Sequence, residues 1–442
     1  MVFLIDSRDA LFGRKNYSNL LREQLCEKIL DILVNLGKTA DELSYNVYLV
    51  GGIVRDLILE KKNYDIDVVI EGDGIYFVQE FSRRYPCMVK YYKRFKTATL
   101  TFPLGYKVDA ATARSEYYEK PASAPKVKIS SLRKDLFRRD FTINTLAIGL
   151  NPGEFGELID FFNAERDIQE GIVRVIHKRS FVEDPSRVYR AIRFEQRFGF
   201  QLEKQTQKLI EDAVQMRIFD KLSGRRLLTE IQYIFEEDTP LRIIERMETF
   251  DLLKFIHPNM KLDKKSRLLF EHIQEVCLWY NSINGNFEKL IVYLLILLDQ
   301  LRHEEVESMC ERFTMPKRLR DRIVSDHKES RVVSEEMSKI KRVKNSQIYQ
   351  LLSSLSTECL LFSMAKADHY RKNIISLFLT KLRFEKVLIC GNDLKFLGIK
   401  PGKIYKEIFT RLLHERLDGN ISTRDDELNY VKKHYRCSCR PV

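Results

Sequence analysis

The chain has 442 residues, of which 44% are hydrophobic and 31% are charged. At roughly 100–200 residues per domain this length predicts two to four domains, and the composition excludes collagen-like and intrinsically disordered chains. The longest apolar run, residues 290–298, is shorter than the roughly 20 residues of a membrane-spanning helix. The sequence therefore predicts a soluble, globular protein with no membrane partner.

The formal net charge is +12, and residues 371–442 alone carry 16 Lys and Arg against 8 Asp and Glu. A basic excess attracts polyanions and fits a grip on a phosphate backbone, although a solvated helical surface also explains it. The eight cysteines form no CxxC pair. They therefore predict reduced thiols and a cytoplasmic location.

Hydrophobic spacing predicts an α+β region followed by helices. In chain order we expect a helix over residues 17–43, a strand over 46–50, a helix to about 59, a strand over 64–70, a helix over 74–85, and a hairpin of strands 97–102 and 106–111. Residues 115–131 contain two prolines, charges and serines and are expected to form a mobile loop. A short strand-and-turn stretch ends near residue 176, and helical spacing prevails from Asp184 onward.

A diglycine and two aspartates form the sharpest local pattern. Gly51 and Gly52 lie between an expected strand and helix, where backbone can approach a phosphate closely, and Arg55 lies one turn into that helix. Asp65 and Asp67 alternate along a strand and so project from one face. Because adjacent carboxylates repel one another unless a cation lies between them, the pair predicts an Mg²⁺ site that shares phosphate oxygens. A solvated strand face is the alternative.

A third carboxylate would complete such a site. Asp109, on a following strand, is the candidate, and Glu116 is the second choice. The alternative role for Asp109 is that of a strand-end hydrogen-bond acceptor.

Arg138, Arg139, Asp140 and Asn144 form the next polar group. Two arginines beside an acid suit a triphosphate and a ribose hydroxyl. An exposed salt bridge at a helix start is the alternative.

Asp184 and Arg187 are three residues apart at an expected helix start, so they share one helix face. An acceptor beside a donor complements the Watson–Crick edge of adenine or cytosine, whereas guanine and uracil would leave polar groups unpaired. The pair therefore predicts ATP or CTP as substrate. A surface ion pair between these two side chains is the alternative.

Five segments together resemble class II tRNA nucleotidyltransferases and bacterial poly(A) polymerases. They are LVGGIVRDLILEKKNYDIDVV, VDAATAR, RRDFTINTLAIG, IDFFNAERDIQEGIVRVI and SFVEDPSRVYRAIRFEQRFGF. Their order and spacing resemble most closely the catalytic part of longer multidomain relatives that add the terminal A of tRNA. Asn163 and Ala164 stand where such relatives often carry glycines.

The resemblance implies a polymerase-β-like nucleotidyltransferase head followed by an all-helical neck, body and tail. The implied domains are residues 1–178, 179–250, 251–330 and 331–442. It also implies that Asp65 and Asp67 hold two Mg²⁺ ions, with Asp109 as the third catalytic carboxylate. The implied nucleotide-binding residues are Gly51, Gly52, Arg55, Arg139, Asp140, Asn144, Glu183, Asp184, Arg187 and Arg190. Asp160, Asp167 and Arg174 resemble a motif at the hinge between head and neck, and Arg226 and Glu230 a motif of the neck.

The tail contains a turn that opens a helix at Gly402. Backbone N–H groups there, with Lys395, Lys400 and Lys403, are predicted to grip an RNA phosphate. An ordinary helix connector is the alternative.

Three activities share these motifs: addition of the terminal A to the 3′ end of tRNA, addition of the whole CCA end, and poly(A) synthesis on other RNA. The first is our leading hypothesis. A non-catalytic RNA-binding protein explains the motifs less well, because it does not require the intact acidic and basic residues. A DxD glycosyltransferase also explains them less well, because it does not account for the pair Asp184 and Arg187.

Overall fold

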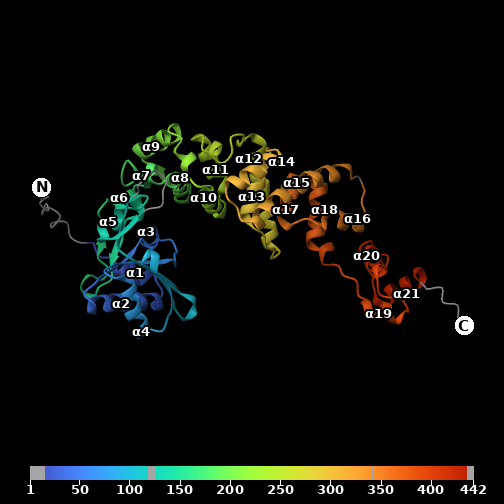
Figure 1. Ribbon diagram of the computed structural model, residues 1–442, viewed down its shortest axis with the longest axis horizontal. Coiled ribbons are helices and arrows are strands. Elements are labelled where there is room, and N and C mark those ends of the chain that lie inside the picture. Colours follow the sequence, from blue (N-terminus) through green and yellow to red (C-terminus); the bar gives the residue numbers. More distant parts are fainter. Residues whose placement is uncertain (1–14, 118–125, 341, 436–442) are drawn as a thin grey trace. The chain divides into compact units, whose positions relative to one another are not determined.

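The computed structural model describes residues 15–117, 126–340 and 342–435 (Figure 1). Contacts divide the chain into two compact units, residues 1–230 with 237–255 and residues 231–236 with 256–442. The finer division into head, neck, body and tail stays a prediction.

A seven-stranded sheet forms the core of the first unit. The strand order is β3-β4-β5-β2-β1-β8-β9. The pair β2–β5 is parallel, and the other neighbours are antiparallel. The strands are β1 (Asn46–Val50), β2 (Ile66–Glu71), β3 (Met88–Tyr92), β4 (Thr97–Thr101), β5 (Lys107–Thr112), β8 (Ala147–Gly149) and β9 (Leu158–Ile159). A mixed sheet ahead of a helical remainder confirms the predicted α+β class.

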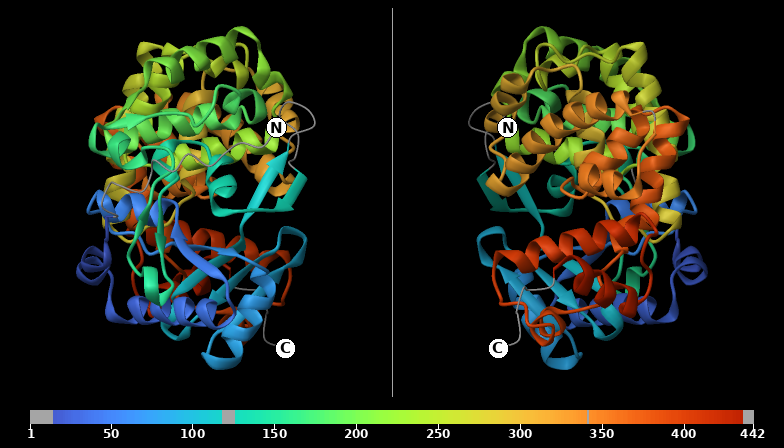
Figure 2. Two further views of the ribbon diagram at one scale, coloured as in Figure 1. Left: turned by 90° about the vertical axis from the view of Figure 1, so that its left-hand side faces the viewer. Right: turned by 90° about the vertical axis from the view of Figure 1, so that its right-hand side faces the viewer.

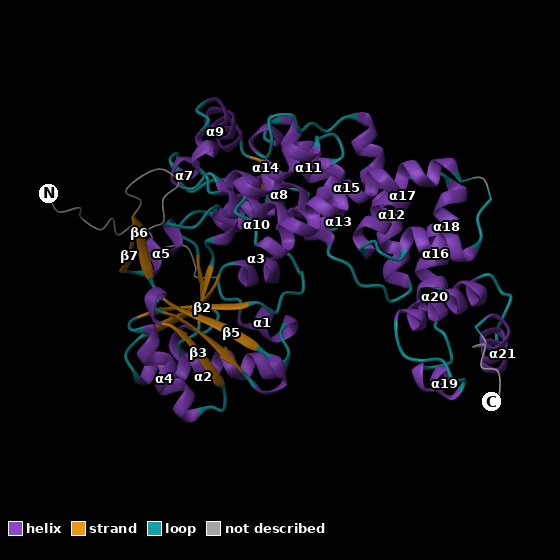
Figure 3. Ribbon diagram, turned by 45° about the vertical axis from the view of Figure 1, so that its right-hand side comes forward, coloured by secondary structure: helices purple, strands orange, loops and turns teal. Residues whose placement is uncertain are grey.

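The two faces of β2 differ, and this difference positions the site. Ile66, Val68 and Ile70 are buried on one face. Asp67 and Val69 alternate onto the other face, where Val69 belongs to a buried cluster with residues of helix α5 (Leu132–Phe137). Helices α2 (Glu27–Glu42) and α4 (Gly74–Arg84) pack against the sheet and each other (Figure 3).

Two sequence expectations for the first unit are wrong in part. The expected helix over 17–43 is two helices, α1 (Ser18–Gln24) and α2, because Leu25 and Cys26 adopt extended backbone conformations. The expected loop over 115–131 instead contains most of β6 (Arg114–Tyr117) and all of β7 (Lys126–Ile129), which pair antiparallel outside the main sheet (Figure 2). The centre of that loop, 118–125, lies outside the described residues.

Asn163 takes a left-handed conformation, with φ of 56°, just before helix α6 (Ala164–Gln169). Asparagine tolerates this region better than most other non-glycine residues do, so the turn does not require glycine here. The carboxylate of Asp160 accepts hydrogen bonds from the backbone N–H groups of Phe162, Ala164 and Glu165 and so holds the turn.

Helices make up most of the remainder of the described chain. Those of the first unit and its boundary are α3 (Gly52–Ile58), α7 (Ser180–Glu183), α8 (Ser186–Phe198), α9 (Lys204–Gln215), α10 (Gly224–Glu236) and α11 (Pro240–Thr249); the short strands β10 (Ile172–Val173) and β11 (Gln201–Leu202) pair in parallel. The second unit contains α12 (Lys264–Ser282), α13 (Lys289–Leu298), α14 (His303–Arg312), α15 (Lys317–Lys339), α16 (Asn345–Leu352), α17 (Thr357–Lys366), α18 (His369–Thr380), α19 (Gly391–Phe396), α20 (Lys403–Leu417) and α21 (Arg424–His434).

The last three helices share a small core of their own, centred on Leu394, Ile408, Leu412 and Val431. Among the described helices, none combines the length and apolar character that a membrane span requires.

Gly37 offers a test of the packing between α2 and the sheet. A Cβ atom at this position would lie 1.8 Å from the carbonyl oxygen of Leu150, so backbone would have to move. We expect Gly37→Ala to destabilise the protein by about 1–3 kcal/mol, as overpacking does, in calorimetric unfolding of the full chain. Gly153→Ala is the control, because its Cβ would meet nothing within 4 Å. Equal stability of the two variants would contradict the described packing.

Candidate functional site

A cleft of about 1250 Å³ opens in the first unit, and residues from several distant segments line it. The predicted residues on its wall are Gly52, Arg55, Asp65, Asp67, Asp109, Arg139, Asp140, Asn144, Asp184, Arg187 and Arg190. The fold therefore gathers most of the predicted site residues around one space.

Two predicted nucleotide-binding residues, Gly51 and Glu183, are not among the residues that line this cleft. Glu183 lines a second cavity, of about 520 Å³, together with His177, whose Nε2 lies 3.5 Å from the Glu183 carboxylate. The structure separates this side chain from its neighbour Asp184, which faces the main cleft.

The diglycine turn packs against a half-buried arginine, Arg139. Gly51 caps α3 with φ of 80°, a conformation that favours glycine. A Cβ at Gly51 would lie 2.7 Å from Nη1 of Arg139 and 3.8 Å from Oδ2 of Asp67. Arg139 donates from the same nitrogen to the carbonyl oxygen of Asn144. The missing side chain at this position thus allows a guanidinium and a carboxylate to meet at the helix start.

The three predicted carboxylates lie on one face at the centre of the sheet. Asp67 of β2 is the register partner of Asp109 on β5, and Asp65 precedes β2 by one residue. Burial raises the pKa of Asp67 to about 6, with a further increase from the negative charges of Asp65 and Asp109, against the opposing charge of Arg139. The ionised carboxylate of Asp67 is therefore unfavourable by itself, and a bound cation or a proton would stabilise the group.

Asp109 has a structural partner as well. The hydroxyl of Thr99 on β4 donates to its Oδ1 at 2.5 Å. Glu116, the other candidate, instead pairs with Arg138 at 3.0 Å. Of the two, Asp109 is the carboxylate that the fold places beside Asp67.

A buried ionic network connects α3, the turn before β8, and α8. Asp140 accepts from Arg190 at 2.7 Å and from Asn144 at 2.9 Å. Burial alone would raise the pKa of Asp140, but the charge of Arg190 and the hydrogen bond from Asn144 lower it to about 2. Arg55 donates to Asn144 at 2.6 Å and to its neighbour Asp56 at 2.8 Å. The side chains predicted to contact phosphate and sugar thus hold one another in place.

Asp184 and Arg187 have separate side-chain partners and do not form the surface ion pair considered above. Asp184 forms an ion pair with Arg226 at 2.5 Å and accepts from the hydroxyl of Ser186. Arg187 donates to the hydroxyl of Ser180 at 2.8 Å and to the carbonyl oxygen of Arg138 at 2.7 Å. Both side chains nevertheless line the cleft.

Several cleft residues were not predicted. Arg193 and Arg197 extend the basic face of α8 beyond Arg190. Their spacing of three and four residues indicates that the three arginines share one helix face, and this could have been inferred from the sequence. Tyr92 and Phe95, at the end of β3 and just beyond it, also line the cleft. The run of alternating cations and aromatic residues over 90–96 could have identified them.

In the second unit, the predicted tail residues lie on α19 and at the start of α20. Gly402 is the N-cap of this helix with an extended backbone, and Lys395, Lys400 and Lys403 are exposed. Lys400, Gly402 and Lys403 thus lie at one helix start, whereas Lys395 belongs to the preceding helix α19.

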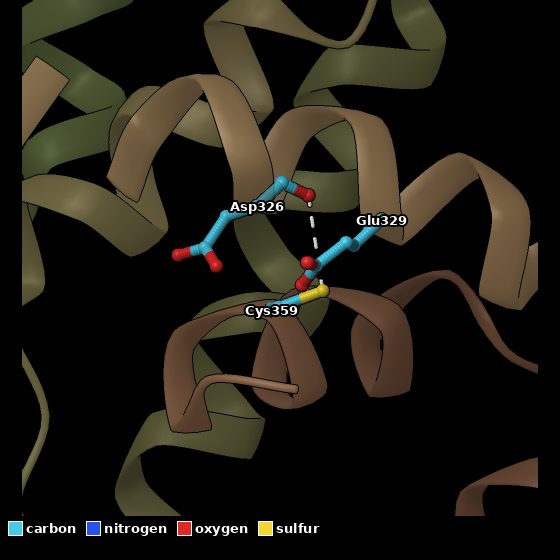
Figure 4. Close-up of side chains that lie close together, drawn as sticks. All are labelled: Asp326, Glu329 and Cys359. Carbon is cyan, nitrogen blue, oxygen red and sulfur yellow. Dashed lines mark hydrogen bonds between the residues drawn. The ribbon is translucent and has the colours of Figure 1, made fainter. Parts of the chain in front are cut away.

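The second unit also contains Asp326, Glu329 and Cys359, whose ligand atoms all lie within 4.8 Å of one another (Figure 4). The Cys359 thiol donates to the backbone oxygen of Asp326, and the Asp326 carboxylate accepts from Ser356. Burial raises the pKa of the Cys359 thiol, which keeps it protonated and opposes its use as a metal ligand.

Comparisons with known proteins agree with this geometry. Residues 47–174 match the model of the poly A polymerase head domain, and residues 199–263 match that of the probable RNA and SrmB-binding site of polymerase A. The CCA-adding enzyme of Thermotoga maritima, solved in complex with tRNA(CCA), is 35% identical with a TM-score of 0.76, over 95% of this chain and 98% of that chain. The chain belongs to the tRNA nucleotidyltransferase and poly(A) polymerase family.

Two further relatives narrow the comparison within this family. A CCA-adding enzyme solved with ATP is 34% identical with a TM-score of 0.78, over 94% of this chain and 98% of that one. The A-adding tRNA nucleotidyltransferase of Geobacter sulfurreducens is 43% identical over 97% of this chain. The chain spans 49% of the length of that relative. A divalent metal ion is typical of nucleotidyltransferases in this family.

The ion pair between Arg190 and Asp140 can be tested directly. Arg190→Gln should destabilise the protein by about 3 kcal/mol, because it leaves a buried carboxylate without its cation. The folded pKa of Asp140 is about 2, below its ordinary value of 3.8. The stabilisation is therefore present above 3.8 and is lost as the pH falls toward 2, and the deficit of the variant should shrink over that range.

Arg197→Gln on the same helix is the matched control, since Arg197 is more exposed and lies 3.6 Å from its partner Glu237. It should cost less than about 1 kcal/mol. A deficit of Arg190→Gln that is equally small, or that does not change with pH, would contradict the assigned network.

Proposed function

We propose that this chain is a template-independent nucleotidyltransferase that adds the terminal A to the 3′ end of tRNA from ATP and releases pyrophosphate. The observation that carries the proposal is the convergence of Asp65, Asp67 and Asp109 on the cleft that Asp184 and Arg187 also line. A charge-binding centre and a pair of base-reading groups thus share one space. The activity named for the Geobacter relative agrees with this assignment.

The carboxylates fit a divalent cation, because burial and then the negative charges of Asp65 and Asp109 raise the pKa of Asp67, and a nearby cation would stabilise its ionised form. Hard oxygen ligands of this kind suit Mg²⁺. We propose that Asp65 and Asp67 hold two Mg²⁺ ions with help from Asp109, and that this metal supplies activation of the RNA 3′-hydroxyl and charge stabilisation of the leaving pyrophosphate.

The chain's own residues would orient the nucleotide. The turn at Gly51 and Gly52 and the guanidinium of Arg139 would bind the phosphates, and Asp140 and Asn144 would accept from and donate to the ribose. Arg55 already donates to Asp56 and Asn144, so a role on the phosphates requires it to exchange one of these partners. Its present contacts suit the positioning of Asn144.

Base selection would use Asp184 as acceptor and Arg187 as donor. Adenine and cytosine both place an amino donor beside a ring-nitrogen acceptor, which these two groups can satisfy together. Arg226 holds Asp184 in this structure, and Ser180 holds Arg187. A bound base would therefore replace, or share, these contacts. Glu183 lines a separate cavity, so it would interact with His177 and would not contact the bound base.

The RNA partner would also contact the tail. Lys395, Lys400 and Lys403, with the backbone N–H groups beside Gly402, form an exposed cationic helix start that suits a phosphate of the RNA backbone. The Thermotoga relative was solved with tRNA. We propose the cytoplasm as the location, because the substrates are found there and the six described cysteines are free thiols.

The experiment that tests this function offers tRNA transcripts ending before CCA, after C and after CC, each with every nucleoside triphosphate and Mg²⁺. We expect incorporation of a single A on the transcript ending in CC. Incorporation of C would instead support full CCA addition, and long A tails on unrelated RNA would support poly(A) synthesis. Absence of any incorporation would contradict the proposal.

Asp67→Asn in the same assay should reduce incorporation by roughly 10²–10³-fold, the range for loss of one group that stabilises the transition state, while tRNA binding is nearly unchanged. Asp73→Asn is the matched control, because Asp73 caps α4 by accepting from the backbone of Ile75 and Tyr76 and asparagine caps equally well. Retained turnover by Asp67→Asn would disprove the assigned metal site.

A further inference from the structure

The outer edge of the sheet carries an unusual set of exposed side chains. β3 is an edge strand, and it and the turn after it expose aromatic residues, with Tyr92 39% and Phe95 51% accessible. Four exposed cations lie among them: Lys90, Lys93, Arg94 and Lys96. Lysines alone protect an edge strand from pairing with other chains, but that purpose does not call for exposed aromatic rings.

The strand register connects this edge to the catalytic carboxylates. Asp67 aligns with Asp109, Asp109 with Thr99, and Thr99 with Lys90, so one row crosses from β2 to β3. Aligned residues point to the same face of a sheet. Lys90 therefore lies on the same face as the carboxylates, about 10 Å from Asp109 at ~4.8 Å per strand.

Tyr92 belongs to the next row on that face. It aligns with Thr97, and Thr97 aligns with Ala111 of β5. The Nζ atom of Lys90 lies 5.3 Å from the centre of the Tyr92 ring, as expected for residues on one face. Tyr92, Phe95, Thr97 and Thr99 all line the same cleft as Asp109. The aromatic edge and the site thus share one continuous surface.

The cleft has two sides with different chemistry. The side formed by Arg139, Asp140, Asp184 and Arg187 is the one assigned above to the incoming nucleotide. The β3–β4 side, across the carboxylates, offers aromatic rings and cations. Rings interspersed with cations are the usual means of binding single-stranded nucleic acid, because every base can stack and every phosphate can pair.

We propose that the surface formed by Lys90, Tyr92 and Phe95 binds the last unpaired nucleotides of the acceptor RNA, with Tyr92 as the stacking platform for a base and Lys90 as a phosphate contact. This inference rests on the proposed function, and it adds to that function a path for the acceptor RNA strand. An RNA whose 3′-hydroxyl reaches the carboxylates passes over this surface with its last few nucleotides.

The test compares Tyr92→Ala, Tyr92→Phe and Tyr91→Ala in the full chain. Tyr91 precedes Tyr92 on β3 and is also exposed, but it aligns with the buried Ala98 and points to the opposite face. Steady-state incorporation of A on a CC-ended tRNA gives the KM for RNA and the KM for ATP. Fluorescence of 2-aminopurine at the penultimate position of the RNA reports stacking and needs no turnover.

We expect Tyr92→Ala to raise the KM for RNA roughly 5- to 150-fold, as expected for loss of one base–aromatic stack, with the KM for ATP unchanged. The same variant should lose the quenching of 2-aminopurine, and Tyr92→Phe and Tyr91→Ala should keep both properties. If Tyr92→Ala fails to fold, Lys90→Ala decides instead: the slope of log affinity against log salt should fall by about 0.7.

A wild-type KM for RNA with unchanged quenching in folded Tyr92→Ala would overturn the inference, as would an unchanged salt slope in Lys90→Ala. Failure of the proposed function has a different signature. The wild-type chain would then incorporate no A, while the dependence of RNA stacking on Tyr92 would persist.

Discussion

Repulsion among three carboxylates is the constraint on which the rest of this site depends. The parallel pairing of β2 with β5 places Asp67 opposite Asp109, and strand alternation adds Asp65 on the same side. Burial and these neighbours raise the pKa of Asp67 to about 6. Such a concentration of negative charge is unfavourable by itself and becomes useful only beside a cation.

Arg139 supplies part of that opposing charge, and it reaches the site because position 51 is glycine. Its Nη1 atom lies where a Cβ on Gly51 would extend. The turn at Gly51, the half-buried guanidinium of Arg139 and the carboxylates therefore depend on one another. Next to them, the network of Asp140, Arg190 and Asn144 ties helix α8, which carries Arg187, to the turn after Arg139. This connection fixes the helix that carries Arg187 relative to the turn after Arg139 within the first unit.

Sequence patterns predicted the parts of this site that short-range rules control. The strand ending at Gly51, the helix after it, and the hairpin leading to Asp109 follow from alternation and from turn residues. The break at Cys26 was missed, since neither glycine nor proline marks it. β3 was missed because an edge strand exposed on both faces lacks the alternation of apolar and polar residues that reveals a half-buried strand.

Partners of charged side chains were the least predictable part. Asp184 and Arg187 were expected to act together, yet one pairs with Arg226 and the other with Ser180. The contact of Arg187 joins residues 7 positions apart, and that of Asp184 joins residues 42 positions apart (184 and 226), so only the tertiary fold determines them. The same holds for the row from Asp67 to Lys90, which spans four strands and became visible only with the strand register.

The central claim is that the cleft aspartates, and not another acidic group, bind the divalent metal. Anomalous scattering from crystals grown with Mn²⁺ and a non-hydrolysable ATP analogue tests it most directly. The account predicts manganese within about 2.2 Å of carboxylate oxygens of both Asp65 and Asp67, close to the distances of comparable hard cations. Manganese bound only elsewhere, for example at Asp326 and Glu329, would contradict it.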